Sequence, residues 1–296
     1  MRIRLIFGLL LMSSFLLAQY PNTDIYLFTL GKDKEGVYRL TEPKYLTNFN
    51  PNGYNAHPHF ISSNELYISV LDPTMDTIQT DIYSLNLSNN VRTQITGTLE
   101  SEHGPQAVPG YSYFSAIRAE ADVDRTQRLW QFPLDRRDQG RPVFPYLRNI
   151  ENHFWIGRNY VALYLTTNPS ELILAKVSDG STQEVAKNVG SCLQRLKNGN
   201  LAFVKKEADQ WVICELDLFS RPFDYQEIVP TLEGVEQFAV LPDGSLLMGR
   251  GSKLYRNDIS QEEKIWEELV DLRYYNIHSI KSMTISTDGK LAMVTQ

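Results

Sequence analysis

The sequence predicts an all-β chain folded as a six-bladed β-propeller, and three observations lead to that prediction. A strand–turn–strand pattern recurs six times, with intervals of 39 to 49 residues between its turns. Each turn is marked by Asn, Asp or Gly. The two ends of the chain each supply half of the sixth repeat. Four strands in each of six such repeats are the arrangement of a propeller.

The recurring pattern is a strand, a tight turn and a second apolar strand. Its six copies are Phe60–Ile68, Ala107–Phe114, Trp155–Leu163, Leu196–Phe203, Leu241–Met248 and Ser286–Met293. Three of the turns are Asn-Gly or Asp-Gly, at positions 198–199, 243–244 and 288–289. Two-residue hairpin turns prefer these dipeptides because both central residues need positive φ. We therefore expect two-residue turns between the first two strands of these blades.

A third strand follows each turn as a short aromatic and β-branched run, which is typical of strands. These runs are Asp81–Leu85, Gln127–Phe132, Glu171–Leu174, Trp211–Cys214 and Lys253–Arg256. The segment Gln261–Asp271 has helical propensity and spacing instead. Because the repeat requires an outer strand there, we expect a strand over residues 266–270 and a turn over 258–263.

The last repeat contains only its first two strands, because just seven residues, 290–296, follow its turn. Asp24–Leu30 and residues 37–41 have the pattern of a third and a fourth strand without the first two. We therefore expect the N-terminal strands to complete the C-terminal blade and close the ring. Closure leaves no open sheet edge between the two ends.

Residues 1–18 are predicted to be a cleaved secretory signal peptide. Arg2 and Arg4 precede an apolar run from Leu5 to Leu17, and Ala18 supplies a small residue for cleavage. A membrane anchor is the alternative, but the run is shorter than the roughly 20 residues that cross a bilayer. Residues 19–296 then form one propeller domain, periplasmic or secreted. After cleavage we expect a monomer that does not span a membrane.

The composition narrows the function classes. The 296 residues carry a net charge of −6, and removal of two arginines makes the mature chain more acidic. That balance argues against a nucleic-acid binder, which needs basic residues to neutralise phosphates. Cys192 and Cys214 are predicted on the first and third strands of one blade, about 9.6 Å apart and beyond disulfide reach. We expect two buried free thiols.

The candidate site is the entry to the innermost strands, which line the central channel of a propeller. Polar residues recur there at a similar offset before the turns: His57, His59, Glu102, His103, Asn152, His153, Ser191, Glu236 and Lys281. Imidazoles and carboxylates are donors for zinc and other transition metals, so a ligand or a metal could sit at this channel mouth. No close His-x₃-His pair lies on one element, and we predict neither a metal nor a cofactor.

Several motifs resemble those of TolB-like six-bladed propellers. His57–Phe60 and Leu241–Gly244 are similar to the Pro-x-Phe-Ser-Pro-Asp-Gly element of that family, although only the second keeps Pro-Asp-Gly intact. Asp24–Tyr26 and Asp81–Tyr83 resemble its Asp-Ile-Tyr, and Arg39–Thr41 its Arg-Leu-Thr. The resemblance covers the whole mature chain and implies a secreted bacterial propeller.

The sequence lacks the local motifs of common catalytic sites. It contains no Gly-x-Ser-x-Gly elbow, no Walker loop and no Gly-x-Gly-x-x-Gly after a strand. We therefore expect a non-catalytic module of the cell envelope that binds a protein or a small ligand. The alternative is a lactonase- or lyase-like propeller enzyme with a polar or metal-bearing site at the channel mouth.

Overall fold

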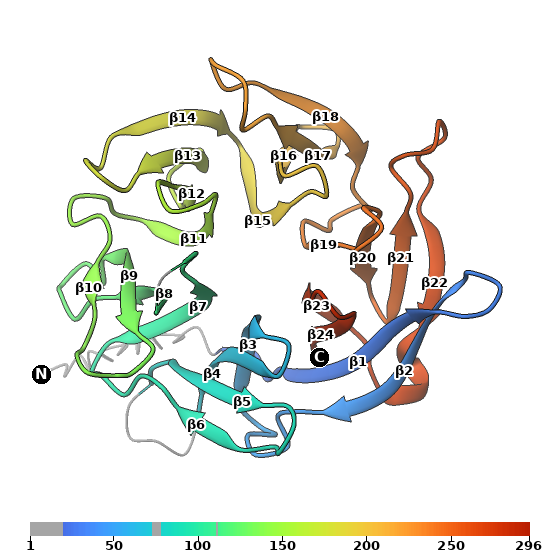
Figure 1. The fold of residues 1–296 in the computed structure, drawn as a ribbon, viewed down its shortest axis with the longest axis horizontal. Helices are drawn as coiled ribbons and strands as arrows, with labels where there is room; N and C mark the ends of the chain where they lie inside the picture. The colour runs from blue at the N-terminus through green and yellow to red at the C-terminus, as the bar shows by residue number, and fades with distance from the viewer. Residues whose placement is uncertain (1–19, 73–77, 111) are drawn as a thin grey trace, which may run out of the picture.

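The computed structural model describes residues 20–72, 78–110 and 112–296, so the predicted signal peptide lies outside the described residues. The fold is all-β: six four-stranded antiparallel sheets are arranged as blades around a central axis (Figure 1). Within the described ranges there is no helix with the length and hydropathy to cross a bilayer. The six-bladed prediction is confirmed.

We number the blades in chain order and give their strands from the axis outward. Blade 1 contains β3 (Tyr54–Ser62), β4 (Glu65–Leu71), β5 (Asp81–Asn86) and β6 (Arg92–Gln94). Blade 2 contains β7 (Ser101–Ala107), β8 (Tyr113–Ala119), β9 (Gln127–Pro133) and β10 (Arg141–Pro142). Blade 3 contains β11 (Ile150–Trp155), β12 (Tyr160–Leu165), β13 (Glu171–Lys176) and β14 (Thr182–Lys187).

The other three blades have the same order. Blade 4 contains β15 (Val189–Arg195), β16 (Leu201–Lys206), β17 (Trp211–Leu216) and β18 (Tyr225–Pro230). Blade 5 contains β19 (Phe238–Val240), β20 (Leu246–Arg250), β21 (Lys253–Asn257) and β22 (Glu267–Asp271), and a 3₁₀ turn, η1 (Leu272–Tyr275), follows it. Blade 6 contains β23 (Ile280–Ile285), β24 (Lys290–Thr295), β1 (Asp24–Lys32) and β2 (Tyr38–Tyr45).

The core lies between blades, where neighbouring sheets pack face to face. Leu201–Val204 of β16 are buried on both faces of the strand, which explains their unbroken apolar sequence. The segment with helical propensity forms β22 over Glu267–Asp271, and turns and bends occupy residues 259–263. Tertiary pairing with β21 therefore overrides local helix propensity there, as expected.

The turns of the Asn-Gly and Asp-Gly repeats differ from the prediction of two-residue turns. Only the glycine has positive φ: 91° at Gly199, 97° at Gly244 and 85° at Gly289. The Gly244 amide donates to the Leu241 carbonyl, and the Leu241 amide donates to the Ser245 carbonyl. This is a longer turn that ends in a left-handed glycine, so the expectation of positive φ at both central residues was wrong.

Both ends of the chain meet in blade 6. β1 pairs antiparallel with β24 from Asp24↔Thr295 to Thr29↔Lys290, and β2 forms the outer edge. Figure 1 shows β1 and β2 beside the C-terminal strands β23 and β24. The predicted closure of the ring by the N-terminal strands is confirmed.

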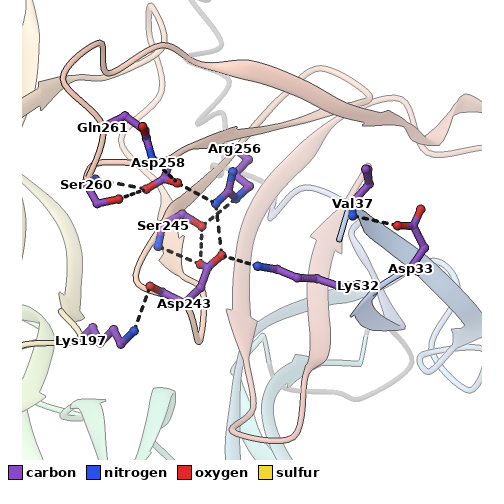
Figure 2. A network of polar contacts seen from close by, with 10 residues as sticks. All are labelled: Lys32, Asp33, Val37, Lys197, Asp243, Ser245, Arg256, Asp258, Ser260 and Gln261. Carbon is purple, nitrogen blue, oxygen red and sulfur yellow. Dashed lines mark hydrogen bonds and ion pairs between the residues drawn. The ribbon is translucent and has the colours of Figure 1, made fainter. Parts of the chain in front are cut away.

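A polar network ties the closing strands to blade 5 (Figure 2). Lys32 Nζ of β1 lies 3.2 Å from Asp243 Oδ2, and Arg256 Nη2 donates to the same oxygen over 3.2 Å. Burial opposes ionisation of Asp243, but hydrogen bonds from Ser245, Tyr38 and Lys32 hold its pKa well below the ordinary value. The carboxylate therefore joins the glycine turn of blade 5 to the N-terminal hairpin.

Replacing Asp243 by asparagine is expected to lower the free energy of unfolding by about 1 kcal/mol at neutral pH, because the group is partly exposed. The depressed pKa stabilises the fold above the unfolded value near 4, and this contribution is lost as pH falls through the folded value. The variant should lose less stability on acidification than the wild type in urea titrations from pH 2 to 7. Asp209→Asn, an exposed loop substitution, is the control, and an equal change in both variants would contradict the prediction.

The two cysteines are buried free thiols on the first and third strands of blade 4, as predicted. Burial raises the pKa of both Cys192 and Cys214 to about 12. Because the thiolate is the reactive form, neither should react measurably with a thiol reagent in the folded protein at pH 8. Both should react after denaturation, and rapid labelling of the native protein would disprove this.

Candidate ligand site at the propeller axis

The innermost strands of all six blades enclose an axial cavity of about 420 Å³. Its wall includes His57–His59, Gly104–Gln106, Asn152, Cys192–Arg195, Gln237 and Ser282–Ile285. Register shifts that mark bulges interrupt five of the inner strands, β3, β7, β11, β15 and β23, near their entry ends. A bulge re-aims the side chains that follow it, so these shifts decide which residues face the axis.

Three side chains from blades 1 to 3 meet at the entry ends of their strands. The rings of His57 and His103 lie 5.5 Å apart, and His103 Nε2 lies 3.5 Å from Glu151 Oε1. Gln127 Nε2 donates to the other oxygen of Glu151 over 2.6 Å. Burial opposes ionisation of Glu151, but these neighbours hold its pKa below the ordinary value. The carboxylate is thus held ionised next to the imidazoles.

A second group joins blades 4 and 5 at the same level. Ser191 donates to Glu236 Oε1 over 2.7 Å, and Lys206 Nζ lies 2.5 Å from Glu236 Oε2. Burial opposes ionisation of Glu236, but Lys206 and Ser191 keep its pKa below the ordinary value. Asn152 of blade 3 donates to the Ser191 carbonyl over 2.6 Å. The polar mouth is therefore built from pairs that satisfy each other across blade boundaries.

Two of the predicted residues face away from the cavity. Glu102 is fully buried, accepts from Arg118 Nε over 2.9 Å and from Thr98 over 2.6 Å, and burial raises its pKa. His153 is also fully buried, and its Nε2 lies 2.7 Å from Ser115 Oγ. Burial and two nearby imidazoles lower the pKa of His153 to about 3. His153 thus links blade 3 to Ser115 of blade 2, whereas Glu102 is bonded to Arg118 within blade 2.

Of the nine predicted site residues, His57, His59 and Asn152 line the axial cavity. His103, Ser191 and Glu236 belong to the polar mouth, and Lys281 is exposed at the start of β23.

Sequence reasoning missed Glu151. In each of blades 2 to 6, the amide of one residue at the end of the inner strand donates across the first hairpin; in blade 3 this residue is Ile156. Glu151 lies five residues before it, and the residues at the same offset in the other blades are His103, Ser191, Glu236 and Lys281. Counting from that hairpin rather than from the turn marker would have selected Glu151 in place of Asn152 and His153. Gln106, Gln194, Arg195 and Gln237 were also missed; they lie later on the same strands or beside them.

The polar groups at the site are hydrogen-bonding side chains. Ser115 and His153 are within hydrogen-bonding distance, but both are fully buried, and no hydrogen-bond partner lies at His153 Nδ1 in the described part of the chain. Among the same residues, no three His, Cys, Asp or Glu side chains are grouped so that they could hold a metal ion. The wall around the axis combines amides, hydroxyls, imidazoles and the Arg195 guanidinium with apolar side chains.

Comparison with known proteins supports the fold. No family model and no curated protein sequence matches the chain. Among solved structures, a putative TolB from Agrobacterium tumefaciens superposes with a TM-score of 0.64 and 10% identity, over 93% of this chain and 98% of that one. TolB from Acinetobacter baumannii superposes with a TM-score of 0.58 and 12% identity, over 92% of this chain.

The chain spans 64% of the length of the Acinetobacter TolB structure. A puromycin-hydrolyzing peptidase from Mycobacterium tuberculosis also superposes, with a TM-score of 0.51 and 12% identity, over 78% of this chain and 47% of that one. Since unrelated functions share one propeller fold, these similarities show a TolB-like six-bladed fold and leave the function to be argued from the site.

Proposed function

We propose that this protein is an exported, non-catalytic binding module that holds a ligand or a segment of a partner protein in its axial cavity. The observation that carries the proposal is the cavity of about 420 Å³, to which every blade contributes. A cavity of this size, with a few convergent polar groups, is the usual form of a small-ligand site.

Free hydrogen-bonding capacity in the cavity wall supports this role. The side-chain amide of Gln106 donates to the His153 carbonyl, and that of Gln237 donates to the Ser191 hydroxyl. The side-chain oxygens of both glutamines have no partner among the described residues. Ser282 and Thr284 of β23 add hydroxyl groups to the same wall. Such groups recognise polar ligands by direct hydrogen bonds.

The cell envelope is the location that we propose, because the sequence of residues 1–18 has the pattern of a secretory signal. Similarity to TolB structures agrees with an envelope protein at the level of the fold. We propose that the mature chain acts as a monomer that presents this cavity to an envelope protein or a small molecule.

Filling the cavity tests the proposal. Thr284→Trp places an indole in the wall, whereas Thr182→Trp makes the same change on the exposed strand β14. In affinity capture from the envelope fraction of the source organism, the Thr284 variant should retain at least tenfold less ligand or partner than the Thr182 variant and the wild type. Equal retention by all three proteins would disprove binding at the axis. Turnover of the captured molecule would favour the enzyme alternative.

A further inference from the structure

The cavity wall has an unusual charge pattern for an acidic protein. Among the described residues that line it, Arg195 is the one permanently charged side chain, and no carboxylate is present. Two acidic groups, Glu151 and Glu236, lie at the mouth, where Glu151 is next to His103 and Glu236 is paired with Lys206. Arg195 is fixed by donating to the carbonyl oxygens of Gly199, Trp155 and Ile156. Arg195 is an exposed residue at the end of β15, so its positive charge lies at the edge of the cavity. An anion inside would meet no carboxylate among the described residues of the wall.

Two histidines of β3 face this space. His57 and His59 line the cavity on either side of Pro58. His57 Nδ1 lies 3.3 Å from Ser69 Oγ. Its other ring nitrogen, Nε2, has no hydrogen-bond partner among the described residues. Burial lowers the pKa of His57 to about 3 and that of His59 to about 4. Both imidazoles are therefore neutral at physiological pH in the ligand-free protein.

The backbone at His57 is strained for a residue that carries a side chain. His57 has a φ of +51°, in the left-handed region that favours glycine. In blade 2 the equivalent bulge contains Gly104, with a φ of +62°, and Gly104-Pro105-Gln106 matches His57-Pro58-His59 position for position. Strained non-glycine residues of this kind concentrate at ligand sites.

We propose that the axial cavity binds a small oxyanion and that His57 or His59 takes up a proton from water as the anion binds. The proposal rests on the binding role of the cavity and names the ligand class. The anion would accept a hydrogen bond from the protonated imidazole, and the positive charge of Arg195 at the end of β15 would favour it at longer range. An imidazolium–oxyanion pair in a buried site forms a charge-assisted hydrogen bond, which neutral imidazole cannot match.

Other charged groups around His57 and His59 raise or lower the pKa of these imidazoles before any anion binds. The titratable groups near these histidines are Glu102 and His103 of β7, Glu151 and His153 of β11, and Lys281 of β23. The strands β4, β1 and β24 also pack against β3, and they carry Glu65 and Tyr67, Asp24, Tyr26 and Lys32, and Lys290. Glu102 is paired with Arg118, and Glu151 with His103 and Gln127. The electrostatic interaction of His57 with His103 opposes protonation, and that with Glu151 favours it. A bound anion adds a second favourable charge.

The linkage fixes the sign of the pH dependence. The bound anion raises the imidazole pKa above its ligand-free value, so the affinity is greatest at low pH. Between the ligand-free pKa and the higher bound value, the affinity falls tenfold for each pH unit and each proton taken up. Above the bound pKa the affinity no longer changes with pH.

Sulfate is a suitable probe because it stays ionised across the working range, so any pH dependence belongs to the protein. The imidazole C–H signals of the full mature chain are titrated by NMR from pH 3 to 8 in sodium sulfate and in sodium chloride of equal ionic strength. We expect the pKa of His57 or His59 to be at least one unit higher in sulfate. His278, exposed and outside the cavity, should not respond.

Variants that copy blade 2 give a matched test that preserves the fold. His57→Gly and His59→Gln turn the blade 1 tripeptide into that of blade 2, whereas His278→Gln is the control. At pH 5 the double variant should bind sulfate at least tenfold more weakly and lose the pH dependence, with thermal unfolding still cooperative. Acetate and methyl phosphate, compared at pH 5.5, then distinguish a carboxylate from a phosphate head group.

Equal histidine pKa values in sulfate and chloride would overturn the proposal. So would sulfate binding that survives unchanged in the double variant, or the absence of sulfate binding at pH 5. These results are independent of the capture experiment with the Thr284 variant. A partner held at the axis without any response to sulfate would leave the binding role intact and remove only the oxyanion assignment.

Discussion

Replacing Arg118 by methionine is expected to lower the free energy of unfolding by about 3–5 kcal/mol at neutral pH. Arg118 of β8 is 4% exposed and its partner Glu102 is fully buried. The guanidinium lies 4.1 Å from the centre of the Trp130 ring and donates to the Gln139 carbonyl. Methionine keeps much of this packing but leaves the Glu102 carboxylate buried without its cation. Chemical denaturation at pH 7 measures the loss.

The Glu102→Gln background separates the charge effect from the packing effect. Burial raises the pKa of Glu102 in the folded state, so its contribution to stability is greatest below the unfolded value near 4.5 and is lost as pH rises through the folded value. The Arg118 variant should therefore recover part of its stability on mild acidification, and Glu102→Gln should rescue much of its loss at pH 7. A loss independent of pH and of residue 102 would show that packing alone is responsible.

Replacing Phe28 by alanine is expected to lower the free energy of unfolding by about 3–5 kcal/mol and to loosen the propeller at the junction of blades 5 and 6. Phe28 of β1 is fully buried, and its ring lies 5.2 Å from that of Tyr275, which follows blade 5. Its apolar neighbours come from blades 5 and 6. The hole left by the missing ring should therefore weaken the junction between these two blades, which the N-terminal strands close.

Phe203→Ala is the matched control, because Phe203 of β16 is equally buried but packs between blades 3 and 4. Both variants should lose similar global stability by urea denaturation. Hydrogen exchange should speed up in β1, β2 and β24 for the Phe28 variant and not for the control. Similar exchange maps for the two variants would show that closure is no weaker than any other blade junction.

The repeats were enough to predict the architecture from the sequence. The complementary half-repeats at the two ends identified β1 and β2 as the outer half of blade 6, and the structure has them there. The turns were predicted less well, because Asn-Gly and Asp-Gly are compatible with more than one hairpin type. The carboxylate of Asp243 accepts from Ser245, which favours the longer turn seen here.

The candidate site was predictable only in outline. The offset before each turn selected residues at the entry ends of the inner strands, but bulges in β3, β7 and β11 change which side chain faces the axis. Glu102 and His103 are neighbours in sequence, yet one is buried against Arg118 and the other lies beside Glu151. The partners that fix these orientations are Arg118 of β8 and Gln127 of β9. They lie on the second and third strands of blade 2, and no local sequence pattern predicts these contacts.

Ring closure has a kinetic consequence for a chain that grows from its N-terminus. The hydrogen bond from Thr295 to the Asp24 carbonyl joins residues 271 positions apart, whereas blades 1 to 5 are each built from consecutive strands. Distant closure costs only about 0.6 kcal/mol for each doubling of loop length, but contacts of high sequence separation form slowly. The first strands to be made should thus be the last to become ordered, and pulse-labelled hydrogen exchange during refolding should find β1 protected after β16. Until then the ring has a free edge at β24, open to pairing with another chain.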